Sequence, residues 1–288
     1  MSTVEIEAPG TVRIWLRRLR SLEFILGAVL TVAMIGLVLA SGLIFPDGGD
    51  AMDLTARLTP PFQSWAHPLG TDPLGRDVLA RVVVGGKISL TVGFLSVLGA
   101  VVVGTVMGLV AGYYRGVWDM ILMRFADVQL ALPFILLAIT FTAILGADLW
   151  NLILFMIIAQ WVQYARVMRA SVLSLRDREF IQSARSFGVR DLRILLHHIL
   201  PNAYGPVLIL MTLNVANNIL LESSLTFLGL GVDPMIPSWG GMLADGRSYL
   251  QTAWWVSVFP GLAIMLTVLG LNLLGDWLRD FLDPTSKA

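Results

Sequence analysis

The sequence contains no cysteine, few histidines and little charge. Among its 288 residues there are three histidines, 20 basic and 20 acidic residues, and the formal net charge is zero. Without cysteine the chain has no disulfides, thiolate metal sites or cysteine nucleophiles. Charged residues make up 14% of the sequence, whereas soluble domains contain about 25%. A neutral chain also lacks the strongly basic field that attracts nucleic acid, so we expect no nucleic-acid partner.

Catalytic motifs are missing as well. The stretch GGKIS at residues 85–89 resembles part of a phosphate-binding loop, but Ile88 follows Lys87 where the Walker pattern needs Ser or Thr. His197 and His198 are adjacent, so on a helix they point about 100° apart and do not share a metal. The sequence has no Gly-x-Ser-x-Gly elbow. We therefore expect no catalytic, cofactor-binding or metal site in this chain.

The sequence is instead rich in long apolar runs. Hydrophobic residues make up 56% of the chain, and the mean hydropathy is +0.77. A helix needs about 20 apolar residues to cross a bilayer, and in lipid a helix satisfies every backbone hydrogen bond internally. The first run is too long for a signal peptide, whose apolar region has about 7–15 residues. The sequence thus predicts an all-α polytopic membrane protein with six transmembrane helices at 22–45, 88–112, 128–145, 150–164, 204–225 and 254–274.

The distribution of basic residues predicts the topology. With a cytoplasmic N-terminus, fifteen of the 20 lysines and arginines fall on cytoplasmic segments and five on external ones. Because cytoplasmic loops carry the excess of positive charge, we predict that both termini are inside, N-in/C-in. Residues 1–21 then form a cytoplasmic tail, 46–87 an external segment, and 88–288 a core of five helices with a cytoplasmic loop at 168–203.

Two further features concern the ends of the helices. The second external segment, at residues 229–253, combines aromatic and turn residues, and we expect it to lie near the outer membrane interface. Pro133 and Pro260 fall near the predicted starts of the third and sixth helices, where a missing N–H group is tolerated.

The cytoplasmic loop is basic and regularly patterned, and we predict two short helices in it. Asp177 is expected as the N-cap of the first helix, Gly188 as the left-handed residue that ends it, and Pro201 as the stop of the second. Each helix has an apolar stripe, formed by Phe180, Ile181, Ala184 and Phe187 and by Leu192, Leu195, Leu196 and Ile199. The pattern fits either an amphipathic pair at the lipid surface or a docking element for a cytoplasmic partner.

Part of this loop, QSARSFGVRDLRILLHHILPN at residues 182–202, resembles the EAA loop of ATP-binding-cassette importer permeases. Four residues keep the spacing of that motif, namely Ala184, Gly188, Leu200 and Pro201. Three depart from it, namely Gln182, Ser183 and His198. The stretches at 67–90 and 220–243 are similar to external parts of peptide and nickel permeases. The resemblance extends over nearly all of the chain beyond Leu22.

The resemblance implies the C-type permease subunit of a dipeptide/oligopeptide importer, with the type I importer permease fold, in the bacterial cytoplasmic membrane. It implies four kinds of partner: the lipid bilayer, a second homologous permease subunit, two cytoplasmic ATPase subunits that bind ATP and Mg²⁺, and an external substrate-binding protein. The loop is then the element that enters a groove of the ATPase. Its candidate coupling residues are Gln182, Ser183, Ala184, Arg185, Phe187, Gly188, Arg190, Leu200 and Pro201.

The fifth predicted helix carries a polar stripe. Asn214, Asn218 and Glu222 recur every four residues with Asn217 beside them, which spans about 12 Å of helix. Polar groups inside a membrane either line a functional path or hold helices together by hydrogen bonds, and both readings stay open. Gln160 and Gln163 of the fourth helix are further candidates for a path. The alternatives to a peptide importer are an importer for nickel or another small solute and an ion-coupled secondary transporter that uses Glu222.

Overall fold

The computed structural model describes residues 21–282, with side chains to residue 280. The predicted N-terminal tail lies almost wholly outside this range. Over the described residues the chain is helical, and its only β pairing consists of two isolated bridges. Five helices are long and apolar enough to cross a membrane, or six if one bent pair is a single span. The predicted all-α polytopic membrane fold is thereby confirmed.

The five long helices are α2 (Leu22–Ile44), α3 (Val78–Tyr114), α6 (Leu149–Leu175), α10 (Gly205–Phe227) and α12 (Trp255–Leu282). The bent pair consists of α4 (Gly116–Ala131) and α5 (Phe134–Leu145). The shorter elements are η1 (Leu54–Ala56), α7 (Glu179–Ser186), α8 (Asp191–Arg193), η2 (Ile194–Ile199), α9 (Leu200–Ala203), α11 (Trp239–Gly246) and η3 (Arg247–Tyr249).

The prediction of one straight helix at 128–145 is wrong, because Pro133 interrupts it. The axes of α4 and α5 differ by 92°. Proline disfavours the helical conformation of the residue before it, and Leu132 is indeed extended, with φ −89° and ψ 130°. Pro133 itself is the N-cap of α5. Pro260, in contrast, lies inside α12 rather than at its start.

Two other helices are longer than their apolar runs. Helix α3 begins at Val78 rather than at residue 88, because the Asp77 carboxylate caps it by accepting a hydrogen bond of 2.7 Å from the Ala80 amide. Helix α6 continues to Leu175 rather than ending at residue 164. Hydropathy marks the part of a helix that faces lipid, and these ends are more polar.

Helices α3 and α6 pack closely along a row of glycines on α3. A Cβ atom on Gly104 would lie 2.5 Å from the Trp161 carbonyl oxygen, and one on Gly108 would lie 2.5 Å from that of Ala165. Small residues at four-residue spacing let two membrane helices approach backbone to backbone. The two helices therefore form one tightly packed unit.

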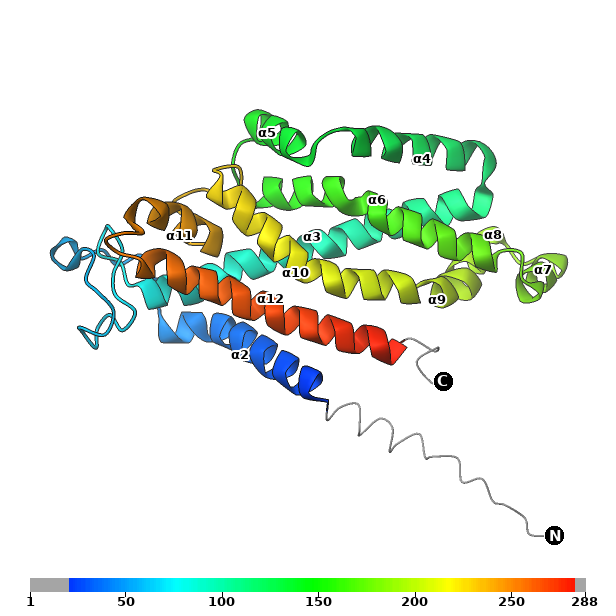
Figure 1. Cartoon of the computed structure of the whole chain (residues 1–288). Coiled ribbons are helices and arrows are strands. Elements are labelled where there is room, and N and C mark those ends of the chain that lie inside the picture. The colour runs from blue at the N-terminus through cyan, green and yellow to red at the C-terminus, as the bar shows by residue number, and fades with distance from the viewer. Residues whose placement is uncertain (1–20, 283–288) are drawn as a thin grey trace, which may run out of the picture.

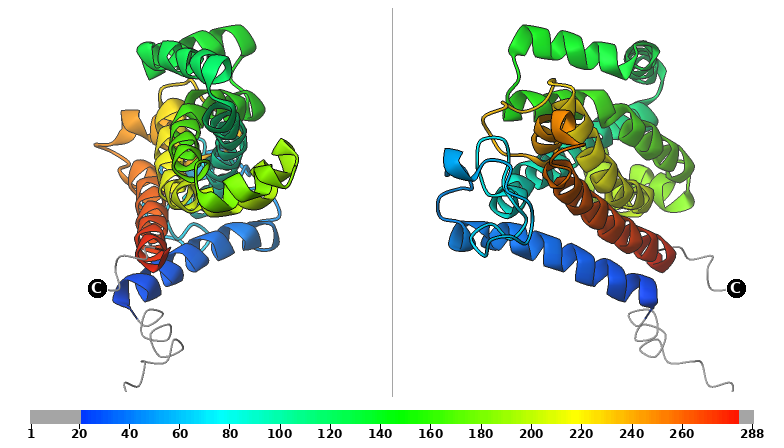
Figure 2. Two further views of the ribbon diagram at one scale, coloured as in Figure 1. Left: turned by 90° about the vertical axis from the view of Figure 1, so that its right-hand side faces the viewer. Right: turned by 60° about the vertical axis from the view of Figure 1, so that its left-hand side comes forward.

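The bundle has two different ends (Figure 1). Helix α7, the start of α2 and the end of α12 lie at one end, which we call the loop end. The segment 46–77 and α11 lie at the other, which we call the opposite end. Both views of Figure 2 show α4 on the far side of the bundle from α2. The described chain thus begins and ends on the same side as the predicted cytoplasmic loop.

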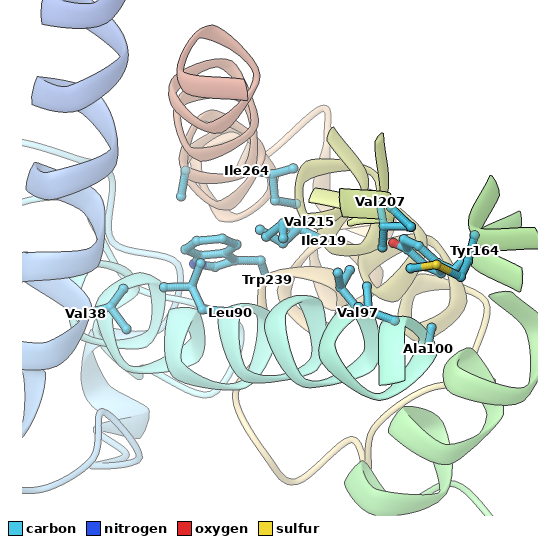
Figure 3. Packing of buried hydrophobic residues seen from close by; sticks show 14 of the residues in the cluster. Val38, Leu90, Val97, Ala100, Tyr164, Val207, Val215, Ile219, Trp239 and Ile264 are labelled. Atoms are coloured by element: carbon cyan, nitrogen blue, oxygen red, sulfur yellow. The ribbon is translucent and has the colours of Figure 1, made fainter. Parts of the chain in front are cut away.

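Near the opposite end the core is centred on Trp239 of α11. Figure 3 shows its ring among Val38 of α2, Leu90 of α3 and Ile264 of α12. The indole is fully buried, and its Nε1 donates to the Val82 carbonyl at 2.8 Å. Trp239 belongs to the segment 229–253, which we expect near the outer membrane interface, and its indole N–H has its partner inside the protein.

Candidate functional site

A polar hollow opens between α6 and α10. Its volume is about 520 Å³, and Leu130 of α4 and Phe134 of α5 complete its wall at the bend. Five amide side chains line it, namely Gln160, Gln163, Asn214, Asn217 and Asn218. The structure therefore brings together five of the six residues that the sequence suggested for a path, and each of the five is uncharged.

The amides of the hollow are only partly satisfied by the protein. Asn214 Nδ2 donates to the Tyr164 hydroxyl at 2.9 Å, and Asn218 Nδ2 donates to Ser96 Oγ at 2.7 Å. Gln160 Nε2 and Asn218 Oδ1 are buried without a hydrogen-bond partner among the described residues. Asn217 is exposed. Since an amide side chain both donates and accepts hydrogen bonds, the hollow is suited to a ligand that offers both an acceptor and a donor.

Glu222 lies apart from this hollow, towards the opposite end. It is fully buried, and its carboxylate accepts hydrogen bonds from Thr226 Oγ1 at 3.0 Å and Ser223 Oγ at 3.2 Å. The Ser89 hydroxyl of α3 also hydrogen-bonds to it, while Ser89 Oγ accepts from the Trp239 amide at 3.3 Å. The group thus joins α10, α3 and α11, and it does not line the hollow.

The loop at the other end contains the predicted turn. Helix α7 ends with Gly188 in the left-handed region at φ +74°. The Gly188 amide donates to the Arg185 carbonyl at 2.9 Å, and the Val189 amide donates to that of Ala184 at 3.1 Å. These two bonds define a Schellman cap, in which glycine is favoured. The prediction for the turn at Gly188 is confirmed.

The first limb of the loop is shorter and more exposed than its stripe suggested. Its N-cap is Arg178 rather than Asp177. Of the predicted stripe, Ile181 is buried and Ala184 half-buried, whereas Phe180 is exposed and Phe187 is 87% exposed. Phe187 leaves the stripe because it is already the C-cap of the helix. The other exposed side chains here are Gln182, Ser183, Arg185 and Arg190.

The second limb departs from regular α-helix. After the single turn α8, residues 194–199 form a π-helix, and α9 then passes through Leu200 and Pro201 to Ala203. A π-helix has more residues per turn, so the buried residues are Ile194, Leu195 and Ile199, while Leu192 and Leu196 are exposed. The predicted stripe assumed the period of an α-helix throughout, and only two of its four residues, Leu195 and Ile199, are buried. Pro201 also does not stop the helix where predicted.

Sequence reasoning missed Tyr113, which anchors this loop. Tyr113 is the penultimate residue of α3 and is almost fully buried. Its hydroxyl donates to Asp191 Oδ1 at 2.6 Å, and the Arg185 guanidinium lies 5.0 Å from the centre of its ring. Only the position of an aromatic pair, Tyr113–Tyr114, at the end of the second apolar run could have drawn attention to it.

The chain thus combines helices long enough to span a membrane, a hollow lined by amide and apolar side chains, and an exposed loop at one end, which is compatible with a membrane transport subunit. Residues 104–287 match the family described as "Binding-protein-dependent transport system inner membrane component". The chain belongs to this family of inner-membrane transport permeases, whose members are non-catalytic membrane subunits.

Three relatives align with most of this chain. The dipeptide transport system permease protein DppC of Alkalihalophilus pseudofirmus is 43% identical over 92% of this chain and 86% of its own. The glutathione transport system permease protein GsiD of Pectobacterium atrosepticum is 46% identical over 78% of this chain and 75% of its own. A putative peptide transport system permease protein of Brucella suis is 40% identical over 94% and 91%.

The fold has a counterpart among solved structures. A chain in the inward-facing crystal structure of the MetNI methionine ABC transporter superposes with a TM-score of 0.55 at 17% identity. The match covers 71% of the present chain and 97% of that chain. At this identity the likeness concerns the fold alone, and it agrees with the importer permease fold that the sequence resemblance implied.

Proposed function

We propose that this chain is a pore-forming permease subunit of an ATP-driven, binding-protein-dependent importer of di- and oligopeptides. The family and the printed names of the relatives support the transport of peptides. The observation that carries the proposal is the hollow between α6 and α10, because five uncharged amide side chains line it together with apolar residues.

The chemistry of the hollow matches a peptide backbone. The amide side chains that line the hollow carry both N–H donors and C=O acceptors, and Asn217 is exposed. A peptide bond offers the complementary carbonyl acceptor and N–H donor. An uncharged lining of this kind binds the backbone irrespective of side chains. The alternative cargo, nickel, prefers imidazole or thiolate ligands, and the residues of the hollow include neither.

The exposed loop at the loop end is the second feature that supports the proposed function. Its turn residues and Phe187 are exposed beyond the bundle, where a partner protein reaches them (Figure 1). We assign the loop end to the cytoplasm, in keeping with N-in/C-in topology. Two ATPase subunits bind there and hydrolyse ATP. The sites for ATP and Mg²⁺ belong to these subunits and not to the permease chain. A second homologous permease completes the pore, and an external binding protein delivers the peptide.

In this mechanism closure of the ATPase pair moves the loops of both permeases. The packed helices then tilt as rigid bodies between inward-open and outward-open states. The ATPase moves the candidate coupling residues of the loop, which are Gln182, Ser183, Ala184, Arg185, Phe187, Gly188, Arg190, Leu200 and Pro201. The amides of the hollow hold the peptide while access alternates.

Two matched glycines test the coupling role. Gly188 at the loop end and Gly229 at the opposite end have φ values of +74° and +78°, and neither is crowded at the Cβ position. Both sit in the same kind of cap, since the Leu230 amide donates to the Leu225 carbonyl as that of Val189 does to Ala184. Proline is incompatible with a positive φ, so Gly188→Pro and Gly229→Pro impose similar local strain.

We expect Gly188→Pro to keep the protein in the membrane but to lose the ATPase in pull-downs from mild detergent and to abolish dipeptide uptake. Gly229→Pro is expected to keep the ATPase bound. If the wild-type chain brings down neither an ATPase nor a second permease, the importer proposal is wrong. Uptake driven by a proton or sodium gradient, by the chain alone, would instead support the secondary transporter.

A further inference from the structure

Tyr113 contacts both limbs of the loop at once. Its hydroxyl donates to Asp191 Oδ1 at 2.6 Å, and Asp191 is the first residue of α8. The guanidinium of Arg185, in the last turn of α7, lies 5.0 Å from the ring centre, and that of Arg176, the C-cap of α6, lies 6.0 Å away. A single side chain on α3 therefore binds the segments before and after the turn at Gly188.

The directions of these contacts distinguish Arg185 from the other basic residues of the loop. A guanidinium over an aromatic face is attracted by the negative face of the ring quadrupole. Arg185 therefore faces Tyr113 of its own bundle, whereas the exposed Phe187 and Gly188 face outwards. The outer part of the loop is free for a partner, and the inner part is attached to α3.

Helix α3 continues this attachment through the whole bundle. It has 37 residues, which at 1.5 Å per residue gives a length of about 55 Å. Its glycines hold it directly against α6. At the opposite end, Arg81 Nη1 of α3 donates to Asp72 Oδ2 at 2.8 Å and lies 3.5 Å from Asp245 Oδ2 of the α11 helix. Polar contacts thus join one end of α3 to the loop and the other end of α3 to the opposite end of the bundle.

We propose that Tyr113 is the positioning residue that ties the loop to α3, so that movement of the loop reaches the opposite end through this helix. The inference rests on the proposed coupling role of the loop. The Tyr113–Asp191 bond and the Tyr113–Arg185 contact keep the two limbs in fixed register with α3. Without them the loop still binds its partner through its outer face but turns relative to the bundle.

The test compares two adjacent tyrosines in the assembled transporter. Tyr113→Phe removes the hydroxyl that binds Asp191 and keeps the ring beneath Arg185. Tyr114→Phe is the matched control, because Tyr114 is half exposed and touches Tyr113 only through its ring edge, at 5.1 Å between centroids. The readouts are ATPase co-purification, thermal stability and the ratio of ATPase rates with and without peptide-loaded binding protein.

We expect Tyr113→Phe to bind the ATPase normally and to lower the stimulation ratio about tenfold, the change that corresponds to one hydrogen bond to a charged group. Tyr114→Phe is expected to leave the ratio unchanged. Asp191→Ala is expected to match Tyr113→Phe, and the double variant is expected to be no worse than either single one, as for two residues acting through one contact. Additive losses, or an unchanged ratio in Tyr113→Phe, overturn the proposal.

A distance measurement supplies a readout that a stability defect does not imitate. Because the chain has no cysteine, spin labels are introduced selectively at the exposed Ser174 of α6 and Ser186 of α7. We expect one narrow distance distribution in the wild-type background and a broader one with Tyr113→Phe. If the two distance distributions are equally narrow, the proposal that Tyr113 holds the loop in register with α3 is wrong. If wild type shows no stimulation by loaded binding protein, the proposed function fails instead.

Discussion

The two ends of the bundle differ in how their charged side chains are placed. At the opposite end Asp72 is buried and paired: its Oδ2 accepts hydrogen bonds from Arg76 Nε at 2.6 Å and Arg81 Nη1 at 2.8 Å, and its Oδ1 accepts from the Leu74 and Arg76 amides. At the loop end, charged and aromatic side chains are exposed around Gly188. The opposite end is therefore stabilised by buried ion pairs around Asp72, although Phe62 and Trp65 are exposed there, whereas the turn at Gly188 is exposed at the loop end.

Glu222 resembles Asp72 in having a buried, paired carboxylate, although the sequence pattern grouped it with the amides of the candidate path. Its carboxylate is saturated by Ser223, Thr226 and Ser89. Asn218, one turn earlier on α10, retains an Oδ1 that is unpaired among the described residues, whereas Asn214 is paired through its Nδ2 with the Tyr164 hydroxyl. We infer from the difference that Glu222 joins helices, and that the neutral amides lining the hollow are the better candidates for contact with a ligand.

The largest effect is expected from Asp72→Ala at the opposite end. The substitution leaves Arg76 and Arg81 without their main partner in a buried environment, and breaking a buried pair costs about 3–5 kcal/mol. Thermal unfolding in detergent, followed by tryptophan fluorescence, measures the loss. Asp53→Ala is the control on the same segment, because that carboxylate is exposed and only caps Thr55. Equal melting temperatures for the two variants would contradict the contrast between the ends.

A smaller loss of stability is expected in the helix that connects the two ends. Gly108→Val places its Cβ 2.5 Å from the Ala165 carbonyl oxygen, and overpacking of this kind costs about 1–3 kcal/mol. Gly36→Val on α2 is the matched control, because nothing lies within 4 Å of its Cβ position. Thermal unfolding again gives the measurement. A destabilised Gly36→Val with an unchanged Gly108→Val would mean that α3 and α6 are not held together by this row.

The sequence predicted most of the long helices because hydropathy measures burial in lipid directly. It also predicted the turn at Gly188, since a left-handed cap needs glycine. It failed where local backbone chemistry overrides periodicity, as at Pro133, where the span bends, and at Ile194–Ile199, where the π-helix changes the period. The partners of Glu222 and Tyr113 come from residues as distant as Ser89 and Asp191. No pattern along one helix contains such contacts.

At the loop end we expect a change in binding with no change in stability. Phe187 is 87% exposed, so Phe187→Ala leaves the melting temperature unchanged. An aromatic anchor in an interface contributes more than about 1 kcal/mol, so the ATPase is expected to dissociate several-fold more readily in quantitative pull-downs. Phe62→Ala, at the opposite end and 82% exposed, is the control. Loss of the ATPase in Phe62→Ala but not in Phe187→Ala would reverse our assignment of the two ends.

The smallest effect is expected from Glu222→Gln, which decides between a joint and an ion-coupling group. Glutamine has nearly the same shape and keeps one oxygen that accepts from Thr226 or Ser89, so the contact between α10, α3 and α11 survives. We expect ATP-driven peptide uptake in proteoliposomes to stay within about twofold of wild type, since neutral hydrogen bonds of this kind contribute only about 0.6 kcal/mol each in membranes. A secondary transporter that binds a proton or sodium at Glu222 loses its coupling in this variant, so abolished uptake would show that the buried carboxylate carries charge during transport and is more than a joint.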